Sequence, residues 1–318
     1  MTIFQFHSNL LSSLLARFVY FFVAPASPRP FACLRIGMAS FLLVKAWVEF
    51  NHLLDLYGNR GLFPWIIGEI LIPDDWSPRM SWYSDALNLS DAGRDILVYV
   101  VFSLYVLSLI GLLIGFHSRL MAIFAWLTHL TLLNNSGMSA YGVDAFSNIA
   151  LFYCVIMPVG ASASLDHRFD RTSEQPTSSA RLFLRLLQIH LCLVYLTSGL
   201  AKAKGIQWWN GEAIWRAIMQ PQFKVFDLSW LAWVPWLAML ICWGTLLLEL
   251  GYCVFIWLPQ TRALWLLSII GLHFCIGLIM GLWLFAAVMI ILNLSAFGSA
   301  LPIGWISNSQ KFDLPLLD

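Results

Sequence analysis

The chain has 318 residues, of which 60% are hydrophobic and only 11% are charged, and its mean hydropathy is +0.76. This composition is typical of a polytopic membrane protein and excludes a soluble globular domain. A formal net charge of +1 gives no general attraction for nucleic acid, and no polar segment combines clustered Lys/Arg with aromatics, so no nucleic-acid partner is predicted. The expected fold class is all-α, a polytopic bundle of about eight transmembrane helices with additional interfacial helices.

Three regions are expected in chain order. Residues 1–29 form an amino-terminal segment whose apolar run is interrupted by one arginine and followed by prolines, which favours a helix lying on the membrane surface. Residues 30–298 form the transmembrane domain, with a net acidic outer loop at 51–95 and a polar inner linker at 161–180. Residues 299–318 form a carboxy-terminal tail.

Apolar runs of the length that a bilayer requires recur along the transmembrane domain. They cover residues 31–50, 96–116, 120–133, 145–159, 181–202, 230–258, 263–280 and 282–297. A further segment at 210–219 has helical spacing with one apolar side, so we expect it to lie along the interface. Lys and Arg in the short loops are more numerous on the side of the membrane that holds the amino terminus. Because such loops usually face the cytoplasm, we predict that both termini are cytoplasmic.

The cysteines and the known catalytic motifs give no metal or nucleotide site. All six cysteines fall inside apolar segments without a CxxC pair, so they are expected to be packing residues, and no metal is predicted. No HExxH, GxSxG, GxGxxG or P-loop element is present, so zinc hydrolysis, α/β-hydrolase chemistry and nucleotide binding lack motif support. The cysteines are Cys33, Cys154, Cys192, Cys242, Cys253 and Cys275.

The stretch YLTSGLAKAKGIQWW at 195–209 is the first candidate site. Tyr195, Ser198 and Lys202 fall at helical spacings that put them on one face of the helix. Gly205 then breaks the helix, and two tryptophans follow, which places the lysine near an aromatic belt at the membrane interface. A lysine at the end of a spanning helix usually extends to the interface without a chemical role, and we keep that interpretation for Lys204, which points to nearly the opposite side.

Ionisable residues inside the apolar runs form a second group of candidates. His129, His190, Glu249 and His273 all fall near the middle of their expected spans, where ionisable groups are costly to bury. Each imidazole, neutral at that depth, can simply hydrogen-bond to a neighbouring helix. Glu249 has no basic residue within one helical turn, so it must be protonated or paired across helices. Its candidate partners are Arg35, Lys45 and a histidine.

Three blocks of the sequence resemble the transmembrane part of the vitamin K-dependent gamma-carboxylases and their bacterial relatives, the horizontally transferred transmembrane (HTTM) domain proteins. The blocks are NNSGMSAYGVDAF at 134–146, RLLQIHLCLVYLTSGLAKAKGIQWWNGEAIW at 185–215, and LLLELGY with the segments that follow it up to residue 281. The middle block is the most specific, because a Ser/Ala-Gly-x-x-Lys step at a helix end followed by Trp and Gly is seldom met outside this family. A difference is that residues 136–139 contain no histidine, whereas the animal carboxylases have one near this position.

The resemblance implies a catalytic role for Lys202, as a neutral amine that deprotonates a reduced quinone similar to vitamin K. A lysine at a dry boundary has its ammonium form disfavoured, which is compatible with that role. Asp144, at the lip of a span, and Tyr141 are the further catalytic candidates. The residues expected to bind the quinone cofactor are Tyr195, Ser198, Trp208 and Trp209.

Three classes of function follow. The first is an integral-membrane enzyme similar to a carboxylase or lyase, located in a bacterial cytoplasmic membrane and acting on a quinone-like lipid or an exported peptide. The second is a non-catalytic membrane partner in the export, maturation or immunity of a secreted peptide toxin. The third, less favoured because no internal repeat is visible, is a proton-coupled transporter that uses the buried glutamate and histidines. Membrane lipid is a partner in every case, and a secreted peptide or partner protein in the first two.

Overall fold

The computed structural model describes residues 14–71, 77–135 and 141–301, and these residues form an all-α bundle. Within the described residues the only β pairing is an isolated bridge between Ala26 and Thr177. The expected fold class is therefore confirmed. Part of the polar 134–144 segment, residues 136–140, and most of the expected tail lie outside the described residues.

Each of the expected apolar runs forms a helix. Among the described residues, six helices are long and apolar enough to cross a membrane, while α7 and α8 are shorter or less apolar and pack among them. The run at 230–258 is divided: a 3₁₀ turn, η3 (Ser229–Trp233), precedes a helix that begins at Pro235, a residue whose missing N–H suits the first helical position. The long helices are α2 (Arg29–Glu49), α6 (Asp91–Ile114), α7 (Ser118–Asn135), α8 (Gly142–Ile156), α10 (Ser178–Ala203), α13 (Pro235–Phe255), α14 (Pro259–Met280) and α15 (Trp283–Phe297).

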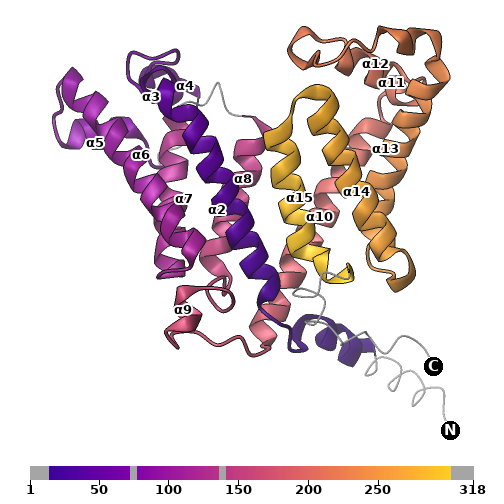
Figure 1. Ribbon diagram of the computed structural model, residues 1–318, viewed down its shortest axis with the longest axis horizontal. Helices are drawn as coiled ribbons and strands as arrows, with labels where there is room; N and C mark the ends of the chain where they lie inside the picture. The colour runs from indigo at the N-terminus through magenta and orange to yellow at the C-terminus, as the bar shows by residue number, and fades with distance from the viewer. Residues whose placement is uncertain (1–13, 72–76, 136–140, 302–318) are drawn as a thin grey trace.

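Short helices cover one end of the bundle (Figure 1). Two of those in the 51–95 loop, α3 and α4, lie above α2, and α11 and α12 lie above α10, α13 and α14. The opposite end holds α9 and the surface helix Leu14–Val23, whose exposed leucine and phenylalanine side chains suit a membrane surface. The short elements are η1 (Phe50–His52), α3 (Leu53–Tyr57), α4 (Trp65–Leu71), α5 (Met80–Ala86), α9 (Leu165–Arg168), α11 (Ile206–Trp209), α12 (Glu212–Ile218), η2 (Pro221–Phe223) and η4 (Gly298–Ala300).

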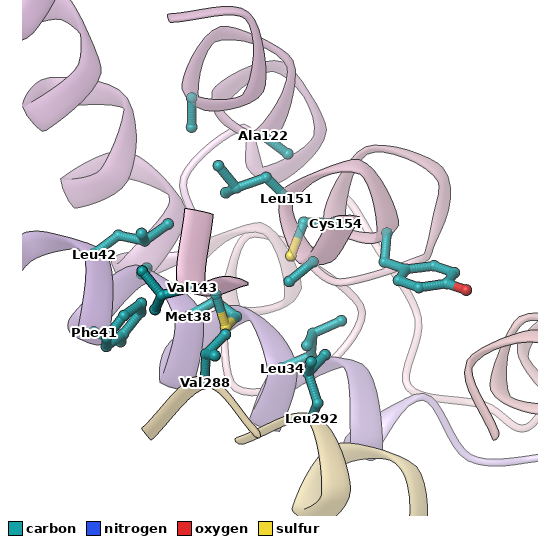
Figure 2. Packing of buried hydrophobic residues seen from close by; sticks show 14 of the residues in the cluster. Leu34, Met38, Phe41, Leu42, Ala122, Val143, Leu151, Cys154, Val288 and Leu292 are labelled. Carbon is teal, nitrogen blue, oxygen red and sulfur yellow. The ribbon is translucent and has the colours of Figure 1, made fainter. Parts of the chain in front are cut away.

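Two groups of long helices meet along α15. One group contains α2, α6, α7 and α8, the other contains α10, α13 and α14, and α15 packs against α2, α8, α10 and α14. Figure 2 shows the contact of the first group with α15, where Leu34 and Met38 of α2 face Val288 and Leu292 of α15, and Val143 of α8 lies beside them. All five are at most 2% exposed. Because lipid tails are as apolar as leucine, close van der Waals packing of this kind, rather than exclusion of water, holds such helices together.

Arg35 is a fully buried cation that joins α2 to the end of α6. Its guanidinium donates hydrogen bonds to the carbonyl oxygens of Leu112 (2.7 Å) and Leu113 (2.5 Å), in the last turn of α6. It also donates to Val159 (3.0 Å) and Ala163 (2.5 Å) in the connection between α8 and α9. The last carbonyls of a helix have no partner within it, so Arg35 supplies donors that lipid could not.

Asp166 supplies hydrogen-bond acceptors to the unpaired N–H groups at the start of α7. Its carboxylate accepts hydrogen bonds from the backbone N–H groups of His117 (2.9 Å) and Ser118 (2.7 Å) and from the Ser118 hydroxyl (2.7 Å). Burial alone would raise the pKa of Asp166, but these hydrogen bonds outweigh it and hold the pKa below its usual value. The negative charge thus stabilises the amino terminus of α7.

Candidate functional site

Lys202, at the end of α10, contacts side chains of its own helix and of α13. The Lys202 amine donates a hydrogen bond to the Ser198 hydroxyl (2.5 Å), one turn earlier on the same face, and its distances to the two Glu249 carboxylate oxygens are 2.8 and 2.7 Å. The side chains of Lys202 and Glu249 are 24% and 9% exposed. Lys202 therefore does not extend freely into solvent. The interpretation of a lysine that merely extends to the membrane interface does not describe it. Lys204 is exposed, as expected.

The partner of Glu249 differs from each of the candidates that the sequence suggested. Arg35 is bound to backbone carbonyls, and Lys45 contacts Glu49 and Asp144. The expectation that one of these residues or a histidine pairs with Glu249 was wrong, because α10 brings Lys202 alongside α13 instead.

Gly199 explains how α10 and α13 approach so closely next to the ion pair. A Cβ atom at this position would lie 2.9 Å from Leu250 Cδ2 and 3.2 Å from the Leu250 backbone nitrogen. Small residues at helix contacts in membranes allow this close approach. The Ser-Gly-x-x-Lys step therefore has a geometric meaning: glycine admits α13, and serine and lysine flank the contact.

A cavity of about 520 Å³ opens beside the pair. Its polar wall is formed by Ser198, Lys202, Glu249 and by His273 of α14. The other walls are mainly apolar, and α12, η3 and the segment between them cover it with aliphatic and aromatic side chains. These are Ala213, Ile214, Ala217, Ile218, Leu228, Trp230 and Leu231. The volume and the few convergent polar groups are typical of a site for a small, largely apolar ligand.

Tyr195 connects the cavity to a hydrogen-bonded network inside the bundle. Its hydroxyl lies 2.8 Å from His273 Nε2, and it accepts a hydrogen bond from the Asn293 amide nitrogen (2.7 Å). Asn293 in turn accepts from the Tyr252 hydroxyl (2.7 Å) and donates to the Met289 carbonyl (2.8 Å). This network holds the ring of Tyr195 against the cavity wall, so the predicted Tyr195/Ser198/Lys202 face does line one site.

Of the two tryptophans expected near the site, one contributes to it. The Trp208 ring centroid lies 5.5 Å from the Lys202 amine, within the range of a cation–π contact, and Trp208 lines the cavity. Trp209 is 48% exposed, donates its indole N–H to the Ala203 carbonyl and does not line the cavity. Trp209 instead caps the end of α10.

Asp144 lies in a different ionic cluster, in the other group of helices. Its carboxylate is 3.2 Å from the Lys45 amine, which also contacts Glu49 at 2.5 Å, and Glu49 accepts a hydrogen bond from the Tyr57 hydroxyl (3.1 Å). Tyr141 is the N-cap of α8, where its backbone N–H donates to Asp144, and its side chain is 44% exposed. Neither Asp144 nor Tyr141 lines the cavity next to Lys202.

The other two histidines each bind a tyrosine on a neighbouring helix. His129 Nδ1 is 3.2 Å from the Tyr105 hydroxyl, and His190 Nδ1 is 2.7 Å from the Tyr153 hydroxyl. Both therefore match the structural interpretation of an imidazole that bridges two helices. Within the described ranges, no group of three or more His, Cys, Asp or Glu side chains is arranged to hold a metal ion.

Sequence reasoning missed Asn293, Tyr252 and the Lys202–Glu249 pairing. Asn293 carried a usable signal, since it is the single amide in an otherwise apolar helix. Tyr252 carried a weaker one, three residues after Glu249 on the same side of α13. The pairing itself had no signal in a single sequence, because 47 residues separate the two partners.

Together, the helical bundle and this site define a multi-pass integral membrane protein with a lysine–glutamate pair in an apolar cavity. The HTTM domain family model matches residues 85–298, and the chain belongs to this family. The match contains α10, α13 and α14, which supply the polar groups of the cavity. Neither a curated protein nor a solved structure matches the chain.

Proposed function

We propose that the cavity beside Lys202 binds a lipid with a polar ring, such as a reduced quinone, and that Lys202 and Glu249 together accept a proton from it. The observation that carries this proposal is the position of the ion pair, at the wall of an apolar cavity of about 520 Å³. A reduced quinone would supply an acidic ring hydroxyl and reducing power toward oxygen. The cavity fits such a group because its lining is mainly apolar and its polar groups converge on one side.

The pair gains one proton in the proposed step, whichever partner receives it. If the resting pair is an ammonium and a carboxylate, Glu249 takes the proton; if it is an amine and a carboxylic acid, Lys202 takes it. Both routes end with an ammonium at Lys202 and a carboxylic acid at Glu249. The Lys202 ammonium would be placed to donate a hydrogen bond to the oxygen of a bound ligand, and this would favour the transfer in a site with few other polar groups.

Other residues of the cavity orient the ligand and exclude water. Ser198 holds the amine on the cavity side of α10 through its 2.5 Å hydrogen bond. Trp208 provides an aromatic face near Lys202, and the apolar cover from α12 and η3 limits the entry of water. A dry site strengthens the electrostatic interactions within it.

The experiment compares purified wild type with Lys202→Ala and Glu249→Gln, using reduced menadione as the probe. Binding is followed by tryptophan fluorescence, and turnover by consumption of the reduced probe under oxygen. Both variants are expected to lose turnover by about a hundredfold or more, the contribution of a general base. Lys204→Ala is the matched control and is expected to behave as wild type, since Lys204 is exposed and does not line the cavity.

Two results would contradict the proposal: full turnover in Lys202→Ala, or no binding of the reduced probe to wild type. Binding without turnover in wild type would instead favour a non-catalytic partner in peptide export or maturation. A carboxylase or lyase step on an exported peptide stays a prediction from the family resemblance. Incorporation of labelled bicarbonate into a peptide encoded beside the gene tests it.

We further propose that both termini face the cytoplasm of a bacterial cell, so that the cavity end of the bundle faces outward. Arginines in the connections at the α9 end support this orientation by the positive-inside rule. A cysteine introduced at exposed Asp170 in a cysteine-free background should be protected from an impermeant thiol reagent in intact cells. Rapid labelling of that cysteine would reverse the assigned orientation.

A further inference from the structure

Two arginines near the start of α10 contact the surface helix Leu14–Val23 and the chain that follows it. Arg185 donates from Nε to the Phe21 carbonyl oxygen (3.1 Å), close to the end of that helix. Arg181, one turn earlier on α10, donates to the carbonyls of Ala24 (3.0 Å) and Pro25 (3.2 Å). Both arginines therefore lie at the depth of a helix whose exposed apolar side chains suit the membrane surface.

The Arg185 guanidinium lies against two aromatic rings that also contact each other. It is 3.9 Å from the Phe21 ring centroid and 5.2 Å from that of Trp257, and the two centroids are 5.5 Å apart. These contacts fix the plane of the guanidinium. A third arginine, Arg262 at the start of α14, donates to the carbonyl of Trp257 (2.9 Å) and adds a further positive charge nearby.

Arg185 retains hydrogen-bonding capacity that the described residues do not use. A guanidinium has five N–H groups. In the described chain, the Nε group binds Phe21 and one Nη1 group binds Gln188 Oε1 (2.8 Å), which leaves three. Neither Arg185 nor Arg181 forms an ion pair with a carboxylate of the described residues.

We propose that Arg185, with Arg181 and Arg262 beside it, binds the phosphate of an anionic phospholipid in the leaflet on the side of the surface helix. A planar guanidinium with free N–H groups suits two phosphate oxygens. The surface helix sets the depth at which phosphates of that leaflet lie, and basic sites between helices are known to recognise anionic head groups. The surface helix, α10 and α14 thereby become a lipid-binding site at the end of the bundle opposite the Lys202 cavity.

The test is native mass spectrometry of the full-length protein with phosphatidylglycerol and, separately, phosphatidylcholine that carries the same acyl chains. Wild type is expected to retain phosphatidylglycerol in preference to phosphatidylcholine. Arg185→Gln is expected to lower that preference about fivefold, the equivalent of the ~1 kcal/mol that one basic residue contributes at an anionic surface. Arg119→Gln is the matched control, since Arg119 is also an arginine bound to a backbone carbonyl, that of Val155, and is expected to keep the preference.

Equal retention of the two lipids by wild type, or an unchanged preference in Arg185→Gln, would overturn the proposal. Inorganic phosphate distinguishes the two sources of a phosphate group. If it stabilises wild type but not Arg185→Gln against heat, while phosphatidylglycerol shows no preference, the site binds free phosphate and not lipid. Should Arg185→Gln not remain monodisperse, Arg185→Lys decides: loss of the planar fork is expected to reduce the preference, and a full wild-type preference contradicts the assignment.

Discussion

Gly199 of α10 lies against the backbone of Leu250 on α13, immediately beside the contact between Lys202 and Glu249. The close approach of the two helices at Gly199 and the ion pair are thus parts of one structure. The geometry of the candidate site depends on a residue that makes no polar contact through a side chain.

Gly199→Ala is expected to separate α10 from α13 and to weaken ligand binding. The added methyl group would lie 3.2 Å from the Leu250 nitrogen, which is tight for a backbone atom that cannot rotate away. Overpacking of this kind costs about 1–3 kcal/mol. Thermal unfolding and probe binding measure the effect. Gly244→Ala in α13 is the control, because nothing lies within 4 Å of a Cβ atom there; equal effects of both substitutions would show that the close approach is unimportant.

A double-mutant cycle on Lys202 and Glu249 is expected to show strong coupling in stability. Removal of one partner leaves the other charge without compensation, which costs about 3–5 kcal/mol for a fully buried pair and less here, since Lys202 is 24% exposed. The double variant Lys202→Met/Glu249→Leu should recover most of that loss, because apolar residues often replace a buried pair at little cost. Thermal unfolding of the four proteins provides the measurement, and strictly additive losses would show that the pair contributes no coupling.

Stability is expected to fall in acid through Asp166. The hydrogen bonds at the start of α7 lower its pKa below the ordinary value of 3.8, so this carboxylate stabilises the folded state fully above pH 3.8. The contribution disappears as the pH falls through the lowered pKa. Asp166→Asn should therefore unfold at lower temperature at neutral pH and lose less on acidification than wild type. Asp170→Asn is the control, because Asp170 is exposed and its positive φ of 54° suits asparagine.

Asp144→Asn tests whether the ionic cluster around Lys45 acts independently of the Lys202–Glu249 pair. Asp144 contacts Lys45 and does not line the Lys202 cavity, so the substitution is expected to lower the unfolding temperature and leave binding of reduced menadione unchanged. Fluorescence titration and thermal unfolding on the same sample give both quantities. A loss of probe affinity equal to that in Lys202→Ala would restore the sequence-based catalytic role of Asp144.

Much of the fold was predictable because membrane helices carry their signal locally. A run of apolar residues specifies a spanning helix without knowledge of its neighbours, and prolines mark where several of them begin. The face formed by Tyr195, Ser198 and Lys202 was predictable for the same reason, since helical spacing alone brings these side chains together.

The remainder of the site depends on contacts between helices, which a single sequence does not encode locally. The sequence indicated that Glu249 needs a partner, but it offered no means of choosing among the candidates. Arg35 and Lys45 were excluded only when the packing of the helices showed that each binds other groups. Asp144 follows the same pattern, since its place at a helix lip suggested chemistry and its neighbour turned out to be Lys45.

The amide of Asn293 determines the direction of the hydrogen bonds that reach His273. The Met289 carbonyl can only accept, so the Asn293 nitrogen must face it, and the same nitrogen then donates to the Tyr195 oxygen. The Tyr195 proton is left for His273 Nε2, which places the imidazole's own proton on Nδ1. One backbone carbonyl in α15 therefore sets, through the Asn293 amide, which nitrogen of a histidine at the cavity wall accepts the tyrosine proton.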